Sequence, residues 1–337
     1  MKVYELGAQD GIDSLRLATR TEPAPGPGEA VVEFHANSLN YRDYMIVARI
    51  HSGKKPEERI PLSDGAGEVI AVGEGVKRVK PGDRVVVSFF TGWIDGQFGE
   101  HYFGTDLGGG CDGTLAEQGV FPAEALAPIP DCLSYEEAAC LPCAALTAWN
   151  ALVEFARLKP GDTVLLLGTG GVSVFGLQFA RLSGARAIVT SSSDAKLARA
   201  KELGADALVN YKTTPAWGEA VRELTGGRGA DVVLETGGSA TLEQSIDGAA
   251  SNARIGLIGV LGGVDQTCNP IGILWKNIHL KGIYVGNRRM LEDMMRAMAS
   301  GSLKPVIDKA FAFDEAKAAY HHLASGAHFG KVVIARG

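Results

Sequence analysis

The clearest pattern of hydrophobic and polar positions lies between residues 164 and 190. An unbroken apolar run at 164–167 is followed by the turn sequence Gly-Thr-Gly-Gly, and apolar positions at 172–182 then recur with helical spacing. A short, wholly apolar run is typical of a strand buried on both faces of a parallel sheet. A second apolar run at 187–190 predicts the next strand. The pattern therefore predicts a strand, a tight turn, a helix and a second strand in succession.

The glycine-rich turn in this unit favours binding of a dinucleotide. Glycines let the backbone turn tightly and approach a pyrophosphate, and the N-terminus of the following helix stabilises its negative charge. The common G-x-G-x-x-G pattern would place a glycine at 173, where this chain has Ser173, although Gly176 follows. The alternative is a turn that binds nothing, but the strand-turn-helix context favours the dinucleotide. The predicted contacts in this turn are Gly168, Thr169, Gly170, Gly171, Val172 and Ser173.

The rest of the chain shows two kinds of pattern. Residues 1 to about 125 hold short strand-like runs separated by proline and glycine turns, which predicts a small β-barrel. Later strand-like runs alternate with helical runs, which predicts a doubly wound parallel sheet and the α/β class. The expected strands are 207–210, 231–235 and 254–260, and the expected helices are 194–203 and 241–250. After Gly286 the pattern changes, and helices at 291–298 and 314–324 and a last strand at 331–335 are expected to return to the first domain.

Composition narrows the function classes. The 337 residues suggest two domains, and the net charge of −6 argues against non-specific binding of nucleic acid, which needs a basic surface. The five cysteines are odd in number and scattered, so we expect free thiols. No apolar run approaches the length that spans a bilayer, and the first residues have a strand-like pattern instead of a secretory signal. We therefore expect a cytoplasmic protein without a membrane or nucleic-acid partner.

Several motifs together resemble the zinc-independent members of the medium-chain dehydrogenase/reductase superfamily, close to the quinone oxidoreductase branch. The segments that carry the resemblance are KPGDRV at 80–85, LPCAALTAW at 141–149, GTGGVS at 168–173, LGAD at 203–206 and GKVVI at 330–334. The resemblance implies a GroES-like β-barrel domain made of residues 1–144 and 286–337. It also implies a Rossmann domain at 145–285, a nicotinamide dinucleotide in a cleft, a small-molecule substrate and a homodimer. The strand-like segment at 277–284 is expected to be an edge strand of the Rossmann sheet. An open apolar edge strand can pair across a two-fold axis, so this segment is the expected dimer contact.

The resemblance also bears on a metal. Zinc-dependent relatives hold a catalytic zinc through Cys, His and Cys, and the matching positions here are Asn40, Ser63 and Cys143, with Asp64 in place of a nearby Glu. A catalytic zinc needs three Cys, His or carboxylate donors from the protein. The loop at 91–113 holds a single cysteine, whereas a structural zinc needs four. We therefore expect no metal.

The second expected strand of the dinucleotide unit bears on the choice between NAD(H) and NADP(H). An enzyme of this fold that uses NAD has an acidic residue about 20 positions after the first glycine. This chain has no acid at 188–191; it has Ser191 and Ser192, with Lys196 one helical turn later. Small hydroxyls and a cation suit a 2′-phosphate, so NADP(H) is favoured over NAD(H). The alternative is that the serines only cap a helix and that Lys196 is a solvated charge.

The resemblance implies further cofactor contacts, at Thr147, Tyr211, Thr236, Gly237, Gly238, Gly259, Val260, Leu261, Gly286, Asn287 and Lys331. Without a metal, something else must stabilise the charge that develops on the substrate. The candidates, in segments that face the cleft in relatives, are Asn40, Tyr41, Arg42, Ser63 and Asp64. Tyr41 is either a proton donor, a wall for a flat substrate or a core aromatic residue. Arg42 is either a donor or one half of a structural ion pair with Asp43.

Three functions remain open from the sequence. The first is an NADPH-dependent reductase of quinones or activated alkenes, and the second is a zinc-free alcohol dehydrogenase or ketone reductase. The third is a cofactor-binding protein without activity, since fold alone does not decide function. The histidines do not favour any of the three, because His51, His321 and His322 all have solvated surroundings in the expected elements.

Overall fold

The computed structural model describes residues 1–50 and 53–336, so the expectation for His51 lies outside the described residues. The chain forms two compact units. The first combines Met1–Leu146 with Val285–Gly337, and the second is the intervening segment Thr147–Tyr284. Each unit has its own sheet and its own buried core.

The second unit is built on a six-stranded sheet in which every neighbouring pair is parallel. Its strands are β8 (Thr163–Leu167), β9 (Arg186–Ser191), β10 (Ala207–Asn210), β11 (Ala230–Glu235), β12 (Ala249–Leu257) and β13 (His279–Gly282). Their order is β10-β9-β8-β11-β12-β13. This order reverses direction at the first strand, as in dinucleotide-binding sheets, and it confirms the predicted doubly wound fold. All of β8 is buried, as its unbroken apolar run requires.

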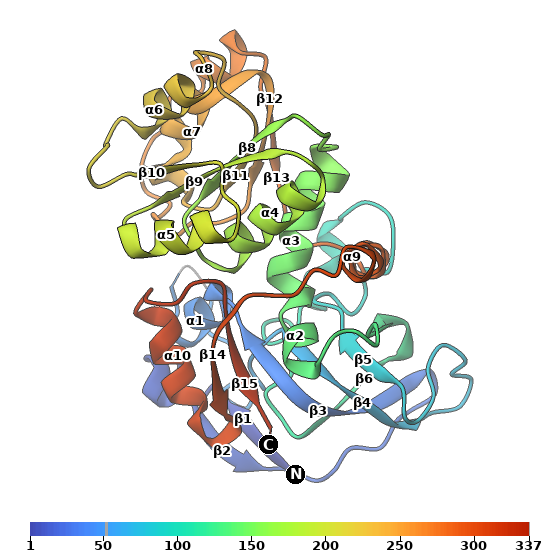
Figure 1. The fold of residues 1–337 in the computed structure, drawn as a ribbon. Helices are drawn as coiled ribbons and strands as arrows, with labels where there is room; N and C mark the ends of the chain where they lie inside the picture. The colour runs from blue at the N-terminus through green and yellow to red at the C-terminus, as the bar shows by residue number, and fades with distance from the viewer. Residues whose placement is uncertain (51–52, 337) are drawn as a thin grey trace. The chain divides into compact units, whose positions relative to one another are not determined.

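Helices cover both faces of this sheet (Figure 1). They are α4 (Gly171–Leu182) and α5 (Asp194–Glu202) on one face, with α6 (Trp217–Leu224), α7 (Leu242–Gly248) and α8 (Ile271–Trp275) on the other. Helix α4 lies very close to the sheet at Gly176. A β-carbon there would lie 2.7 Å from Leu166 Cδ2 and 2.8 Å from Leu234 Cδ2. Glycine at this position therefore lets α4 approach β8 and β11.

Several element boundaries in the second unit differ from the expected ones, and β12 ends at Leu257 where a strand to 260 was expected. Helix α7 ends at Gly248 and β12 begins at Ala249, whereas a helix to 250 and a strand from 254 were expected. The ammonium of Lys276 caps the end of the helix, where it donates to the carbonyl groups of Ile246 (2.8 Å), Asp247 (2.7 Å) and Ala249 (3.0 Å). The expected strand at 277–284 is shorter and spans His279–Gly282. Helix α6 was not expected at all.

The first unit contains a seven-stranded sheet and a separate two-stranded one, β1 (Lys2–Glu5) with β2 (Arg16–Thr19). The larger sheet runs β14-β15-β3-β4-β5-β7, with β6 paired to β3. Its strands are β3 (Glu29–Leu39), β4 (Asp64–Val72), β5 (Arg84–Val87), β6 (Gln118–Pro122), β7 (Leu126–Pro128), β14 (Ile307–Ala312) and β15 (Lys331–Ala335). Strand β15 pairs antiparallel with β3, so the C-terminal tail does return to the first unit, and both ends of the chain lie there (Figure 1).

Four helices flank these strands, namely α1 (Tyr41–Val47), α2 (Tyr135–Ala139), α9 (Arg288–Ser300) and α10 (Ala316–Ala324). Ser134 forms a capping box with Glu137 at the start of α2. The helical path continues through α3 (Leu146–Trp149), which lies between two wider π-helical segments, Leu141–Ala145 and Asn150–Phe155. Pro142 lies at the start of the first wide segment. Proline has no N–H to donate, so the regular ladder of hydrogen bonds is interrupted there.

The long loop at 91–113 is held by stacked and edge-on aromatic rings. Trp93 packs with Phe98 (ring centres 5.1 Å apart) and with Tyr102 (5.8 Å), and Phe90 packs with Phe98 (5.5 Å). Trp93 is almost fully buried. The loop is therefore packed by apolar contact along much of its length.

Candidate functional site

The turn between β8 and α4 presents open backbone. Gly168 has a positive φ of +77°, and β-carbons placed on Gly168 and Gly170 would meet nothing within 4 Å. Gly170 precedes α4, and no side chain caps that helix end. The first N–H groups of a helix have no partner inside it. The N–H groups of the first turn of α4 thus surround a space that an anion can approach closely.

Ser173 has a different role from the glycine that it replaces in the usual pattern. Its hydroxyl is buried and donates to the carbonyl oxygen of Leu167 at 2.6 Å. The hydroxyl of Thr236 donates to the same oxygen at 3.0 Å. These two bonds tie α4 and the turn after β11 to the last residue of β8.

The turn after β11 is organised by Glu235, a residue that the sequence analysis missed. Its buried carboxylate accepts hydrogen bonds from the N–H groups of Gly237 (2.7 Å) and Gly238 (3.0 Å) through Oε1. The hydroxyls of Thr241 and Ser245 also donate to this carboxylate. The N–H groups of Gly237 and Gly238 are therefore used within the protein. An acid directly before Thr-Gly-Gly is the signal that would have predicted this.

The segment after β12 lies beside the Glu235 turn. Leu261 N–H donates to the carbonyl oxygen of Thr236 at 3.2 Å, and Gly259 N–H donates to that of Glu235 at 3.3 Å. The structure thus brings the predicted residues Thr236, Gly259, Val260 and Leu261 to one edge of the sheet.

The residues predicted near the adenosine end also lie together. Ser191 ends β9, and its hydroxyl accepts from Ser193 N–H at 3.3 Å. Ser193 caps α5 by accepting from Lys196 N–H at 3.4 Å. Tyr211 N–H donates to the carbonyl oxygen of Ser191 at 3.1 Å, and its side chain is exposed. Ser192 and Lys196 are half-buried at the same edge.

A buried polar cluster lies in the first unit, where β3 leads into α1. Lys331 on β15 donates from Nζ to Asn40 Oδ1 at 2.6 Å and to the carbonyl oxygen of Leu39 at 2.7 Å. Asn40 Nδ2 donates to Asp64 Oδ2 at 2.9 Å and to Ser63 Oγ at 3.4 Å, and Ser63 Oγ donates to Asp64 Oδ1 at 3.0 Å. Lys331 Nζ is 3.6 Å from Asp64 Oδ2. We call Asn40, Ser63, Asp64 and Lys331 the polar cluster.

Burial dominates the electrostatics of this region. It raises the pKa of Asp64, although Lys331, Asn40 and Ser63 all favour the ionised carboxylate. It also raises the pKa of Asp43 to about 7, with Arg42 opposing the shift and Asp64 adding to it. The pKa of the Cys143 thiol is raised by burial and then by Asp64, so it is not an activated thiol.

Tyr41 and Arg42 begin α1 but face different surroundings. Tyr41 is 37% exposed and packs edge-on with Tyr44, so it is not a core aromatic residue. Burial, and next Tyr44, raise the pKa of Tyr41. Arg42 pairs with Asp106, donates to the carbonyl oxygen of Leu107 at 2.7 Å and lies over the Phe89 ring. Its contact with Asp43 is long, at 4.0 Å, so Arg42 mainly anchors the loop at 91–113.

The remaining predicted residues have structural surroundings. Asn287 caps α9 through Oδ1, which accepts from Met290 N–H at 2.9 Å. A β-carbon on Gly286 would lie 2.8 Å from Leu146 Cγ, so glycine allows a close approach there. Thr147 is buried. The expectation that His322 is solvated is wrong, because it bonds to Asp308 at 2.9 Å and only 24% of its side chain is exposed; His321 is exposed as expected.

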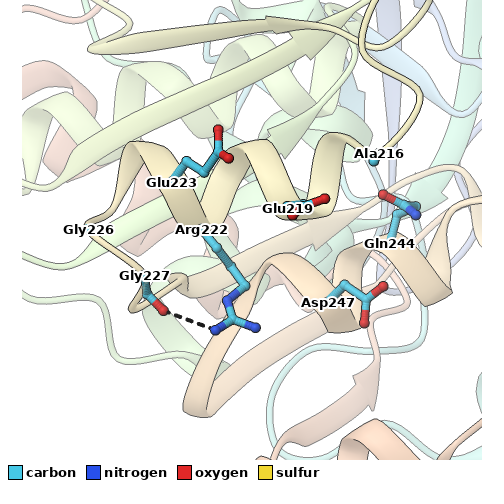
Figure 2. Close-up of a pocket in the computed structure, with 8 residues that line it drawn as sticks. All are labelled: Ala216, Glu219, Arg222, Glu223, Gly226, Gly227, Gln244 and Asp247. Atoms are coloured by element: carbon cyan, nitrogen blue, oxygen red, sulfur yellow. Dashed lines mark hydrogen bonds between the residues drawn. The ribbon is translucent and has the colours of Figure 1, made fainter.

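A hollow of about 770 Å³ lies elsewhere in the second unit, between α6 and α7 (Figure 2). Half of the residues that line it are charged, and Arg222 donates to the carbonyl oxygen of Gly227 at 3.4 Å. The residues that line it are Ala216, Glu219, Arg222, Glu223, Gly226, Gly227, Gln244 and Asp247. None of these is a predicted site residue, so the hollow is separate from the dinucleotide turn.

Within residues 1–50 and 53–336, no three His, Cys, Asp or Glu side chains lie close enough together to hold a metal ion. In the same residues, no helix is long and apolar enough to cross a bilayer.

Comparisons with known proteins now place the chain in a family. Residues 26–131 match the family described as alcohol dehydrogenase GroES-like domain, and residues 171–300 match the family described as zinc-binding dehydrogenase. The chain is 43% identical to a zinc-type alcohol dehydrogenase-like protein of Schizosaccharomyces pombe, over 96% of both chains. It is 29% identical to a crotonyl-CoA reductase of Streptomyces avermitilis, over 97% of this chain and 83% of that protein.

A solved structure of an NAD-dependent alcohol dehydrogenase is 37% identical and superimposes with a TM-score of 0.90 over the whole of both chains. The GroES-like unit and the Rossmann sheet are thus both shared with known oxidoreductases. With its sheet order and its glycine turn, the chain belongs to the medium-chain dehydrogenase/reductase superfamily and is an NAD(P)-dependent oxidoreductase.

Proposed function

We propose that this oxidoreductase works without a metal and uses NADPH to reduce a quinone or an activated alkene or carbonyl compound. The observation that carries the proposal is the polar cluster. Where zinc-dependent relatives would hold their metal, this chain has an ammonium, an amide, a hydroxyl and a carboxylate that bond to one another.

The donors in this cluster do not suit zinc. The ammonium of Lys331 would repel a dication, and Asn40 Nδ2 already donates to Ser63 and Asp64. The carboxylates and thiols near the cluster belong to Asp43, Asp64, Cys140 and Cys143. In the part of the chain that the structure describes, no three such groups gather, and a catalytic zinc needs three donors from the protein. We expect elemental analysis of the purified protein to find no stoichiometric zinc and expect chelators to leave its activity intact. One tightly bound zinc per chain, with activity lost on its removal, would contradict the proposal.

The second unit suits a dinucleotide. The uncapped first turn of α4 and the open space at Gly168 and Gly170 fit a pyrophosphate. When bound, the nicotinamide cofactor would supply the hydride. The protein's part is to hold the cofactor: Ser191, Ser192 and Lys196 would bind a 2′-phosphate, and Glu235 would hold the turn that includes Thr236.

In the first unit, Tyr41 is the residue best suited to meet the substrate. Its ring is partly exposed, and its phenol can donate a proton or a hydrogen bond at neutral pH. Asn40, Ser63 and Asp64 would position Tyr41 by fixing the start of α1. Arg42 would fix the loop at 91–113. Tyr41→Phe should then lower kcat while leaving the affinity for NADPH unchanged.

A second candidate function is an alcohol dehydrogenase, which the names of the relatives favour. The relative described as a crotonyl-CoA reductase instead favours reduction of a carbon–carbon double bond next to a carbonyl. The deciding experiment follows NADPH oxidation with quinones, enones and simple aldehydes. Turnover of quinones or enones supports the proposal, and turnover of aldehydes alone supports the second candidate.

We also propose that the protein is a homodimer joined at the sheet edge of the second unit. Strand β13 is the last strand of the sheet, and beside it α8 exposes 72% of Leu274 and 79% of Trp275. A second copy would pair this edge and cover these side chains. Light scattering should give twice the chain mass, and Trp275→Lys should shift the mass towards one chain. A wild-type monomer at micromolar concentration would contradict the dimer.

A further inference from the structure

The edge of β9 and β10 holds a carboxylate that lies just beyond positions 188–191. Asp194 is the first residue of α5, and its Oδ1 accepts a hydrogen bond from Asn210 Nδ2 at 2.6 Å. Asn210 is the last residue of β10 and pairs in register with Ser191. The bond therefore fixes the Asp194 carboxylate beside the serines predicted to receive a 2′-phosphate.

The position of Asn210 is itself well defined. Its Oδ1 accepts from Lys212 N–H at 3.0 Å, and its carbonyl oxygen accepts from Thr214 N–H at 2.9 Å. The amide oxygen of Asn210 is thus held by the following turn, while its amide nitrogen donates to Asp194. Since Asp194 itself is exposed, a ligand at this edge can meet its charge.

We infer that Asp194, oriented by Asn210, is a specificity-determining residue of the adenosine ribose subsite. This inference rests on the proposed function. The carboxylate would repel a 2′-phosphate and accept a hydrogen bond from a free 2′-hydroxyl, whereas Lys196 and the serines favour the phosphate. Lys196 and the serines therefore favour NADPH, and Asp194 favours NADH. The preference for NADPH over NADH is smaller than it would be without Asp194.

The test compares Asp194→Asn with the wild-type protein. Removing one exposed charge and one acceptor should lower the Kd for NADPH about threefold and raise the Kd for NADH about threefold. The ratio of the two constants should therefore move roughly tenfold towards NADPH. Both constants are measured by calorimetric titration of the substrate-free protein, so the result does not depend on turnover. Asn210→Ala should move the ratio in the same direction by less, because it frees the carboxylate without removing it.

The matched control is Glu202→Gln, which makes the same change of charge at the other end of α5. At about 1.5 Å per residue this end is about 12 Å away, and the ratio should not change. Equal changes for both cofactors in Asp194→Asn, with a lowered Tm, would mean that Asp194 only stabilises the helix end and would overturn the inference. So would an unchanged ratio. Failure of the wild-type protein to bind NADPH would instead overturn the proposed function.

Discussion

The two polar regions of this protein are built in opposite ways. In the first unit, Asn40, Asp64 and Lys331 use their polar atoms on one another and are buried. In the second unit, no side chain caps the first turn of α4 after Gly170, and there is open space beside Gly168 and Gly170. A cluster of the first kind holds the fold in place, and a turn of the second kind is ready for a ligand.

The comparison teaches that polar residues near a predicted site are not all ligand groups. Buried polar atoms that have partners stabilise one arrangement of the backbone and are costly to leave unpaired. Open donors contribute little to folding, and they gain a partner when an anion binds. Substitutions in the polar cluster should therefore change stability, and substitutions around the dinucleotide should change affinity.

The largest effect is expected from Lys331→Met. It removes the only cation among the four residues of the polar cluster and leaves the buried carboxylate of Asp64 without it. Breaking one partner out of a buried ion pair costs about 3–5 kcal/mol of unfolding free energy. Urea unfolding followed by circular dichroism measures this.

The double variant Asp64→Asn with Lys331→Met is the control for that loss. It removes both charges, so much of the lost stability should return. A single variant as stable as the wild type would show that the cluster does not hold the fold, and the contrast between the two regions would fail.

Asp43, beside the polar cluster, should make stability depend on pH. Its pKa is about 7 in the folded protein against an ordinary value of 3.8, because burial disfavours the carboxylate. The folded state therefore binds the proton more tightly, and this contribution is complete below about pH 4 and is lost as the pH rises to about 7. At about 1.36 kcal/mol per pH unit the loss is at most about 4 kcal/mol.

Asp43→Asn tests this dependence, because it cannot ionise and keeps an oxygen that can accept from Asn40 N–H. Unfolding free energies of both proteins at pH 4 to 8 should diverge in favour of the variant as the pH rises. Parallel curves would show that Asp43 has an ordinary pKa.

A smaller effect is expected on the ligand side from Lys196→Ala. If Lys196 binds a 2′-phosphate, losing a charge-assisted contact of about 1.5–3 kcal/mol weakens NADPH binding roughly 10- to 150-fold. Screening by salt favours the lower end of this range. The affinity for NADH and the maximal rate at saturating NADPH should stay nearly constant. An equal loss for both cofactors would mean that Lys196 supports the fold.

The smallest effect is expected from Ser173→Ala, which removes a buried hydroxyl beside the dinucleotide turn of the second unit. The variant loses the bond to the carbonyl oxygen of Leu167, and Thr236 still donates to that oxygen. A net loss of about 0.5–1.5 kcal/mol in stability is expected. Cofactor affinity should change little, because the backbone N–H groups remain. A large loss of affinity with normal stability would instead show that the hydroxyl itself binds the ligand.

The pattern of apolar residues and glycines along the chain predicted the elements whose structure is decided by residues close together in sequence. The strand β8, the glycine turn and the helix α5 could be predicted, because each is decided by a few neighbouring residues. The end of α7 could not be predicted, since the ammonium of Lys276 that caps it comes from a distant segment. The side-chain partners at the candidate site could not be predicted either, because the two residues of each pair lie far apart in the sequence. Asn40 meets Lys331 across 291 positions, and Asp194 meets Asn210 across 16.

The pairing of β15 with β3 has a consequence for how the protein is made. Residues 332–335 pair with 36–39, so the larger sheet of the first unit lacks one of its inner strands until these residues have been synthesised. At about 5–20 residues per second, that delay is roughly 15–60 s. The segment Thr147–Tyr284 is complete earlier and has its own core, so it can fold first. The newborn protein then carries an unpaired strand edge on β3, and a release that comes too soon leaves that edge open to other chains.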